Sequence, residues 1–285
     1  MIEEQFLQPY CNFLALLGHK VIRTNGIVWV NVRPGVFQPA APFKIHEVTP
    51  ADVSEVLQQG RAIACRWFTE RKSPLTDHDA GVPMTYNATA PYDMSTLHQK
   101  ARNQTRRSLE RVTVRRMELT DSLEPGCYRV YADNVQRLGL FKTESQIRRR
   151  WRRWAVAIRG GFVQLWTAWS DTDLIAFTVA VRTPWGTEII LQRSIGSALG
   201  LCPNNALVYE VTRDAFSHGA NVVSFGLNSF SASKNGLDHF KQNMGFTAVP
   251  LHERYQWNVL LRPFAPLLTP QRLRAVYSFV SRVTA

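Results

Sequence analysis

The sequence contains no long apolar run and no cysteine pattern typical of a metal site or a disulfide framework. No stretch of about 18 apolar residues occurs, so we predict no membrane-spanning helix. The four cysteines among 285 residues stand far apart, without a Cys-x-x-Cys pair or a matching pair of histidines. The first residues are acidic and no apolar signal-peptide core follows them. We therefore expect no metal, no disulfide and a cytoplasmic location.

Acidic residues are few relative to basic ones, and the imbalance is local. The chain has 34 Lys and Arg against 22 Asp and Glu, for a net charge of +12. Between Lys100 and Arg153, fifteen basic residues face six acidic ones. Such a field attracts phosphates, whether they belong to nucleic acid, to an anionic cofactor or to a lipid head group. We predict polyanion binding by a cluster of arginines interleaved with Trp151 and Trp154, namely Arg148, Arg149, Arg150, Arg152 and Arg153.

The first hundred residues combine helical and strand patterns. A two-stranded hairpin is predicted around Asn25-Gly26, one of the strongest short turn signals. Residues 33–42 are predicted as an irregular loop. Residues 69–90, rich in Pro, Asp, Thr and Asn, lack periodicity and are predicted as a mobile or active-site loop. The predicted helices are 5–17 and 50–59, and the predicted strands are 20–24, 27–32 and 62–68.

From residue 94 the pattern is that of an α+β domain with a mixed sheet. A basic helix comes first, and a three-strand meander lies near the centre. The predicted strands are 112–119, 162–169, 174–182, 187–194, 222–227 and 254–260, and the predicted helices 125–138, 144–157, 204–218 and 237–244. An apolar stripe beside arginines in residues 263–285 predicts an amphipathic helix, which packs on protein or contacts a membrane surface.

The stretch from Pro203 to Phe246 carries a family resemblance. A capped helix ends at Gly219, a strand follows with Phe225-Gly226, and Gly-Leu-Asp-His-Phe-Lys-Gln-Asn-Met-Gly-Phe closes the stretch. This pattern resembles the C-terminal half of a GNAT-type acyltransferase, and its spacing is similar to the FemAB-like two-domain branch. The resemblance implies a GNAT-like α+β fold, in which a complete domain follows a degenerate N-terminal one. The implied parts are an acceptor-side domain (1–93), a basic connecting helix (94–111), the acyltransferase domain (112–262) and the amphipathic C-terminal helix (263–285).

The resemblance also implies a phosphate site for acyl-CoA. In GNAT proteins an Arg/Gln-x-x-Gly-x-Gly/Ala loop surrounds a pyrophosphate with backbone amides. Arg193, Gly196 and Ala198 fit that spacing, although the helix begins only at Asn204, so residues 200–205 are a second candidate loop. The predicted cofactor-binding residues are Gln192, Arg193, Ser194, Gly196, Ala198, Asn204, Asn205, Asn228 and Lys234.

Three residues are candidates for catalysis. Acyl transfer needs a neutral amine, a donor for the developing oxyanion and a proton for the leaving group. Glu188 resembles the position of a base in some GNAT enzymes, although a strand glutamate also commonly faces solvent. His239 lies on the last predicted helix, where it faces either the cleft or water. Lys241 occupies the place of the family's usual tyrosine acid, so either another group protonates the leaving thiolate or Lys241 binds phosphate.

Three functions remain open from the sequence. The preferred one is an N-acyltransferase that moves an acyl group from acyl-CoA to an amine, such as an amino sugar, an amino acid or a cell-envelope precursor. The second is an aminoacyl-tRNA-dependent, FemAB-like transferase, in which the arginine helices contact tRNA and tryptophans stack on unpaired bases. The third is a non-catalytic module that binds nucleic acid or an anionic membrane. Peripheral contact with the inner face of the membrane, through residues 263–285, accompanies the cytoplasmic prediction.

Overall fold

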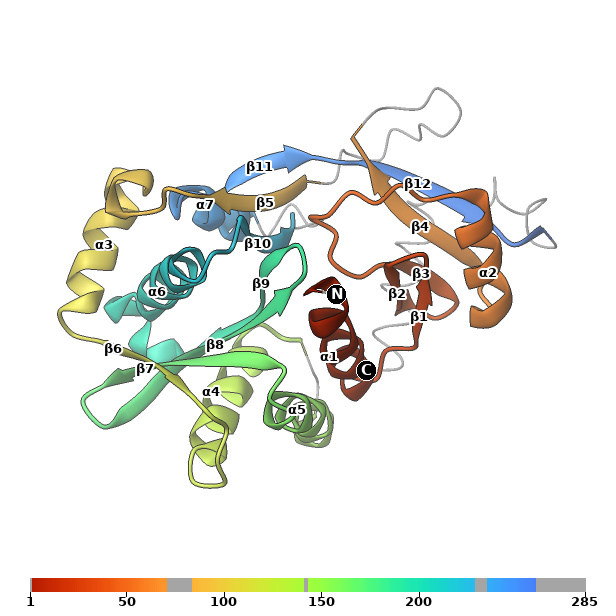
Figure 1. Cartoon of the computed structure of the whole chain (residues 1–285). Coiled ribbons are helices and arrows are strands. Elements are labelled where there is room, and N and C mark those ends of the chain that lie inside the picture. Colours follow the sequence, from red (N-terminus) through yellow and green to blue (C-terminus); the bar gives the residue numbers. More distant parts are fainter. Residues whose placement is uncertain (1, 71–83, 141–142, 229–234, 260–285) are drawn as a thin grey trace. The chain divides into compact units, whose positions relative to one another are not determined.

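The computed structural model describes residues 2–70, 84–140, 143–228 and 235–259 (Figure 1). The chain forms two compact units: a larger unit of Met1–Leu17 with Thr85–Val249, and a smaller unit of Gly18–Met84 with Pro250–Ala285. Each unit contains one sheet with both parallel and antiparallel strands, so the predicted α+β class with mixed sheets is confirmed. The predicted domain boundaries stay predictions. The predicted C-terminal helix, residues 263–285, lies outside the described residues.

The smaller unit has a sheet in the order β1-β2-β3-β4-β12, which α2 covers on one face. The predicted hairpin at Asn25-Gly26 is confirmed, and both turn residues have positive φ, as a tight hairpin turn requires. Thr49 and Asp52 form a capping box that fixes the start of α2. The elements are β1 (Val21–Thr24), β2 (Ile27–Arg33), β3 (Val36–Pro39), α2 (Pro50–Gly60), β4 (Ala64–Thr69) and β12 (His252–Trp257).

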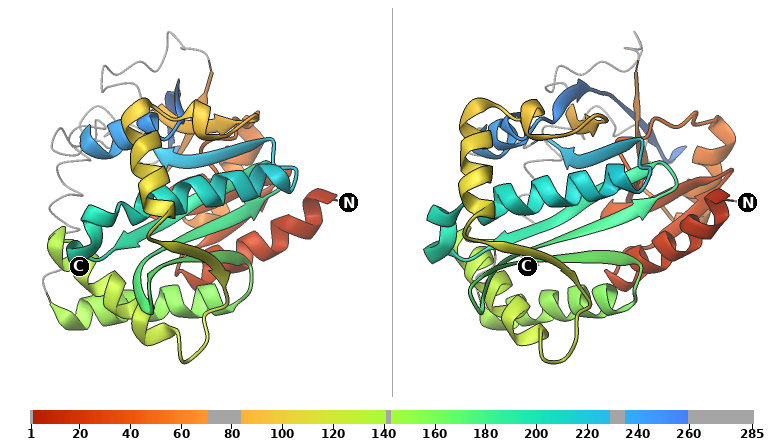
Figure 2. Two further views of the ribbon diagram at one scale, coloured as in Figure 1. Left: turned by 90° about the vertical axis from the view of Figure 1, so that its left-hand side faces the viewer. Right: turned by 60° about the vertical axis from the view of Figure 1, so that its left-hand side comes forward.

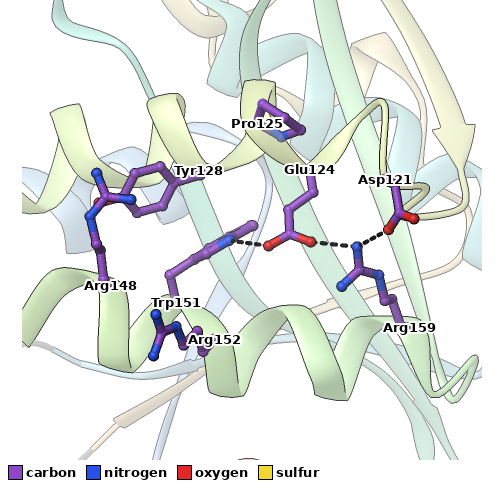
Figure 3. Close-up of a pocket in the computed structure, with 8 residues that line it drawn as sticks. All are labelled: Asp121, Glu124, Pro125, Tyr128, Arg148, Trp151, Arg152 and Arg159. Atoms are coloured by element: carbon purple, nitrogen blue, oxygen red, sulfur yellow. Dashed lines mark hydrogen bonds and ion pairs between the residues drawn. The ribbon is translucent and has the colours of Figure 1, made fainter.

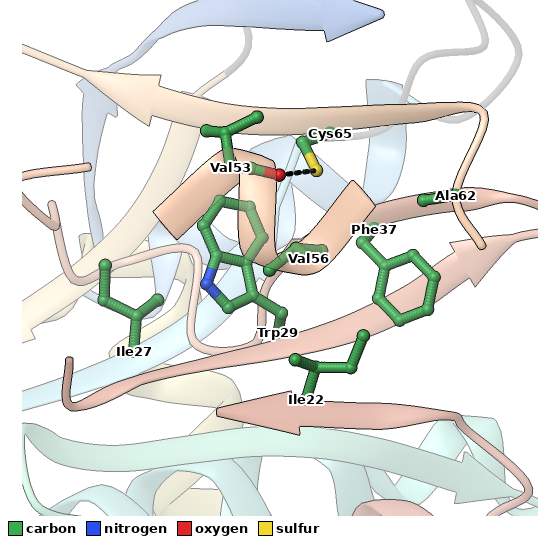
Figure 4. Packing of buried hydrophobic residues seen from close by; sticks show 8 residues of the cluster. All are labelled: Ile22, Ile27, Trp29, Phe37, Val53, Val56, Ala62 and Cys65. Carbon is green, nitrogen blue, oxygen red and sulfur yellow. Dashed lines mark hydrogen bonds between the residues drawn. The ribbon is translucent and has the colours of Figure 1, made fainter. Parts of the chain in front are cut away.

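An apolar cluster between α2 and the sheet forms the core of this unit (Figure 4). Trp29 is fully buried, and its indole N–H donates to Thr24 Oγ1 at 2.9 Å, so its polar atom is satisfied. The loop predicted at 33–42 is wrong in part, because Val36–Pro39 forms β3. This strand depends on pairing with β2 and β4, which overrides the prolines and glycine around it.

The larger unit has a sheet in the order β11-β5-β10-β9-β8-β7-β6. The strands β6 to β9 are antiparallel neighbours, and β10 then returns parallel to β9 through α6. The strands are β5 (Met84–Thr89), β6 (Thr113–Met117), β7 (Val163–Ser170), β8 (Asp173–Thr183), β9 (Gly186–Ser194), β10 (Val222–Leu227) and β11 (Thr247–Pro250).

Helices cover both faces of the larger sheet (Figure 2). On one face α6 contacts β7 to β10, and α3 packs against α6. On the other face α1 and α4 contact β8, and α5 contacts β7 and α1. The helices are α1 (Ile2–Leu16), α3 (Gln99–Leu109), α4 (Glu124–Arg137), α5 (Glu144–Arg159), α6 (Pro203–Ser217) and α7 (Asn235–Asn243), with short 3₁₀ helices η1 (Met94–Thr96) and η2 (Gly196–Leu201). None of the helices in the described part of the chain is long and apolar enough to cross a membrane.

The predicted loop at 69–90 is wrong in part, and the predicted last strand is confirmed with shifted bounds. Residues 84–89, predicted as part of a loop, form β5, which pairs antiparallel with β10 and includes the partners Asn87 and Ser224. A pairing between segments so distant in sequence is set by tertiary contacts, and the short polar segment shows no strand period of its own. The last strand begins at His252 rather than 254, and it pairs with β4 in the smaller unit. The remainder of the predicted loop, residues 71–83, lies outside the described residues.

Gly186 allows β9 to begin close to β10. Its φ is +150°, and a Cβ atom at this position would lie 2.5 Å from the carbonyl oxygen of Val222. We expect Gly186→Ala to lower the free energy of unfolding by roughly 1–3 kcal/mol, because backbone must shift and an unfavourable φ is imposed. Denaturant unfolding measures the change. Gly200→Ala, where a Cβ meets nothing within 4 Å, is the matched control. Equal stability of both variants would show that this close approach is not required.

Candidate functional site

The parallel strands β9 and β10 stay paired over a short distance only. Their recorded partners are Val223 with Thr187 and Ser224 with Glu188, although β9 continues to Ser194 and β10 to Leu227. Both strands are fully described, and no further pairing joins them beyond these two positions. Ligands of sheets with parallel strands bind at the carboxyl ends of the strands. We therefore take the carboxyl ends of β9 and β10 as the candidate site.

Lys241 lies at the end of β10, buried against aromatic rings. Its Nζ donates to the carbonyl oxygen of Leu227 at 2.8 Å and lies 4.8 Å and 5.5 Å from the ring centroids of Tyr86 and Phe225. The side chain is 3% exposed. The Asp238 carboxylate is 3.8 Å away, an ion pair rather than a hydrogen bond. Burial lowers the pKa of Lys241 to about 8, against the opposing effect of Asp238, so the ammonium stays mostly protonated at neutral pH.

The helix that carries Lys241 is held in place at its C-terminus. Gly245 has a φ of +84°, and the amide of Phe246 donates to the carbonyl oxygen of Lys241 at 3.1 Å. This is the left-handed C-cap that the Gly-Phe pair predicts. The hydroxyl of Tyr92 donates to the carbonyl oxygen of Met244 at 2.8 Å. These bonds fix the position of the Lys241 backbone relative to β10.

Glu188 is buried on the opposite face of the sheet from Lys241. It is 8% exposed and hydrogen-bonds with Tyr10 of α1, so it does not face solvent. Burial raises the pKa of Glu188 to about 7, and the bond with Tyr10 lowers it in part. Ser224 is the strand partner of Glu188, so the two side chains share a face of the sheet. Side chains alternate along a strand, so the next residue, Phe225, lies on the other face, together with the Lys241 ammonium over its ring.

The predicted catalytic residues are therefore not brought together as a set. His239 is exposed on α7, whereas Lys241 on the same helix is buried. Glu188 and Lys241 lie on opposite faces of the sheet, and the sequence does not show this because the pairing of β9 with β10 and the position of α7 are set by tertiary contacts.

The backbone amides of the first candidate phosphate loop already have protein acceptors. The amide of Ile195 donates to Ile175 O at 3.0 Å, and that of Ala198 donates to Ile195 O at 3.3 Å. The amide of Gly196 donates to Oδ2 of Asp133 at 2.7 Å. The Asp133 carboxylate repels a pyrophosphate at this loop, and the amide of Gly196 is not free to bind one. The sequence gives no sign of this contact, because Asp133 comes from α4.

The second candidate loop leads into α6 with few free amides. Cys202 has a φ of +53° at the N-terminus of α6, Pro203 has no amide hydrogen, and the amide of Asn205 donates to Cys202 O at 3.0 Å. The side chain of Asn204 donates to Ser194 Oγ at 3.2 Å, and that of Gln192 donates to Asn204 O at 3.1 Å. These residues tie β9 to α6.

Four further predicted site residues lie in different surroundings. Arg193 is half-buried over the ring of Tyr131, at 5.8 Å from the centroid, and burial lowers its pKa. The side chain of Asn205 lies 3.4 Å from the sulfur of Met244. Asn228 follows β10 and is half-buried, whereas Lys234 lies outside the described residues.

The tryptophans of α5 are not available for stacking on bases. Trp151 and Trp154 are 3% and 8% exposed and belong to the core of the larger unit. Trp151 packs against Tyr131 and Phe177, and Trp154 packs against Phe13. The two positions are three residues apart and lie on the inner face of α5. Because both rings are buried there, the prediction that they contact nucleic acid is wrong. Arg152 and Arg153, between the two tryptophans, are exposed on the outer side of α5.

Comparison with known proteins shows similarity in structure only. No family model and no curated protein sequence matches the chain. The crystal structure of FemX has a TM-score of 0.61 at 11% identity, covering 91% of this chain and 93% of FemX. A C-terminal domain described as that of a lysylphosphatidylglycerol synthetase, from Agrobacterium fabrum, has a TM-score of 0.59 at 13% identity and covers 94% of this chain and 96% of its own. L-PGS from Bacillus licheniformis has a TM-score of 0.56 at 13% identity and covers 90% of this chain and 92% of its own.

The chain has a GNAT-like fold. At such low identity the likeness concerns the fold and assigns no role to any residue. Within this GNAT-like fold the predicted site residues lie on β9, η2, α6 and α7, apart from Asn228, which follows β10, and Lys234, which lies outside the described residues. Among the described residues, no three His, Cys, Asp or Glu side chains come together as ligands of a metal ion.

Proposed function

We propose that this protein is an acyltransferase, which moves an acyl group from an activated ester or thioester to an amine. The observation that carries the proposal is the buried ammonium of Lys241 at the carboxyl end of β10. An ammonium has three donor hydrogens, and Leu227 O takes one of them. A buried, fixed cation of this kind is suited to stabilise negative charge that develops on a carbonyl oxygen.

The reaction needs little else from the protein. The amine attacks the acyl carbon, the carbon–nitrogen bond forms, and the charge on the carbonyl oxygen receives a hydrogen bond from Lys241 Nζ. The bond to the leaving oxygen or sulfur then breaks, and the proton lost by the amine passes to the leaving group. The aromatic rings of Tyr86 and Phe225 lower the local dielectric, which strengthens the interaction between the ammonium and the oxyanion.

Of the two donors that the sequence leaves open, we propose aminoacyl-tRNA rather than acyl-CoA. The occupied amides at Ile195, Gly196 and Ala198, and the carboxylate of Asp133 beside them, disfavour a pyrophosphate at this loop. One of the similar structures carries the name of a lysylphosphatidylglycerol synthetase, and a lysyl group is itself an acyl group. FemX spans nearly the whole chain, which supports the FemAB-like branch by analogy of fold.

A melting experiment with both classes of donor tests this proposal. Charged tRNA at about a hundred times its dissociation constant is expected to stabilise the folded protein by roughly 2.7 kcal/mol, and a panel of acyl-CoA compounds is expected to have no effect. Uncharged tRNA serves as the control for charge alone. If an acyl-CoA raises the melting temperature, and Gly196→Val removes that rise with the circular dichroism unchanged, the donor is acyl-CoA. If neither class acts, the protein is a non-catalytic module and the proposal fails.

A further inference from the structure

An open groove of about 360 Å³ lies between α4 and α5 in the larger unit (Figure 3). It is distinct from the site at Lys241, since none of its lining residues belongs to β9, β10 or α7. The residues that matter for its chemistry are Glu124 and Tyr128 of α4 and Arg148, Trp151, Arg152 and Arg159 of α5.

Both acidic groups that line the groove contact one arginine. Nη2 of Arg159 lies 2.6 Å from the carboxylate of Asp121 and 2.5 Å from that of Glu124. The other oxygen of Glu124 accepts a hydrogen bond from the indole N–H of Trp151 at 3.1 Å. Figure 3 shows this chain of contacts along one side of the groove. Both acids are therefore turned toward Arg159, and neither is recorded in contact with Arg152, which lines the groove as well.

The opening of the groove combines an aromatic ring with exposed guanidinium groups. The Tyr128 ring is half-buried, and the guanidinium carbon of Arg148 lies 4.9 Å from its centroid. Arg148 also pairs with Glu144 at 3.0 Å, but both side chains are about half exposed, so this pair is weak. Arg152, one turn further along α5, is exposed, and no ion pair is recorded for it with any residue that the structure describes. Arg149 and Arg153 are exposed next to it on the same helix.

We propose that this groove binds a nucleoside phosphate of single-stranded RNA. The base lies against Tyr128 and the Arg148 guanidinium, because aromatic rings and guanidinium planes both stack on bases. The phosphate contacts Arg152, and the next phosphates of the strand follow Arg149 and Arg153. A lipid surface fits this face less well, because binding in a bilayer interface requires an apolar face and the exposed residues here are mainly arginines.

Fluorescence anisotropy of a labelled single-stranded RNA of about 10 nucleotides, a length within the usual site sizes, tests the proposal. Tyr128→Ala is expected to weaken binding about tenfold, as loss of one stacked base does, whereas Tyr128→Phe keeps the ring and the affinity. Arg152→Gln is expected to reduce the slope of log affinity against log salt by about 0.7, the value for one contact to a single-strand phosphate. Because Arg152 is exposed, this variant is expected to fold as the parent does.

Arg106→Gln, the same change at an exposed arginine of α3, is the matched control and is expected to have the smaller effect. Competition with AMP distinguishes a nucleotide within an RNA strand from a free nucleotide as the ligand of the groove. Retention of the RNA in excess AMP supports a site for the polymer, whereas displacement at low AMP concentration assigns the groove to a free nucleotide and overturns the RNA proposal. If Arg106→Gln and Arg152→Gln weaken RNA binding equally and Tyr128→Ala has no effect, the RNA proposal is also overturned. The binding is then general attraction of a polyanion to the basic surface. Lys241→Met is expected to bind the RNA as the parent does, so the failure of acyl transfer and the failure of this proposal are separate results.

Discussion

Lys241→Met is expected to slow acyl transfer strongly and at the same time to stabilise the folded protein. Methionine has similar length and leaves the aromatic surroundings filled, but it cannot donate to an oxyanion. Loss of one such donor lowers the rate by about 10²–10³-fold. Burial disfavours the charged form of Lys241 and lowers its pKa to about 8. Removing the charge is therefore expected to raise the free energy of unfolding at pH 7 by roughly 1–3 kcal/mol. Loss of the hydrogen bond to Leu227 O reduces this gain.

The two effects are measured on the same variant. Transfer of a labelled acyl group from charged tRNA to a panel of amines gives the rate, and denaturant unfolding gives the stability. Lys100→Met, at an exposed lysine of α3, is the control and is expected to change neither. A Lys241→Met protein that still transfers the label at the parental rate would remove Lys241 from the mechanism. Because the protonated form is the donor, the parental rate is also expected to fall as the pH rises through about 8.

Glu188→Gln is expected to remove a large pH dependence of stability. The pKa of Glu188 is raised from 4.5 to about 7 in the folded protein, so between these values the folded chain holds a proton that the unfolded chain releases. The corresponding stability is complete below pH 4.5 and falls by about 3 kcal/mol as the pH rises to 7. Glutamine is neutral and of the same shape, so the variant is expected to lose this decline and to be more stable than the parent at pH 8.

Denaturant unfolding across pH 4 to 8 checks this expectation. Tyr10→Phe is the companion variant: it removes the hydrogen bond that lowers the pKa of Glu188, so the decline in stability is expected to extend to higher pH. A parent protein whose stability does not fall between pH 4.5 and 7 would contradict the burial of an ionisable Glu188.

Local patterns in the sequence predicted most of the secondary structure of this protein. Asn25-Gly26 predicted the hairpin of β1 and β2, and Thr49-Pro50 predicted the start of α2. Gly245-Phe246, which closes the family-like stretch, forms the C-terminal cap that holds Lys241 in place. These signals are reliable because turn and cap residues act on their own backbone, through φ and through bonds to neighbouring amides. The order of strands and helices from residue 112 predicted an α+β domain with a mixed sheet, and the resemblance in Pro203–Phe246 implied the GNAT-like fold.

Only the tertiary structure decided how the candidate site residues are arranged. It buried Lys241 under aromatic rings, put Glu188 on the other face of the sheet beside Tyr10, and brought Asp133 to the amide of Gly196. It also turned Trp151 inward and left Tyr128 and Arg152 at an open groove. Each of these contacts joins segments that are distant in the sequence. Periodicity records which side of an element is apolar, but it carries no information on which polar group of another element will meet it.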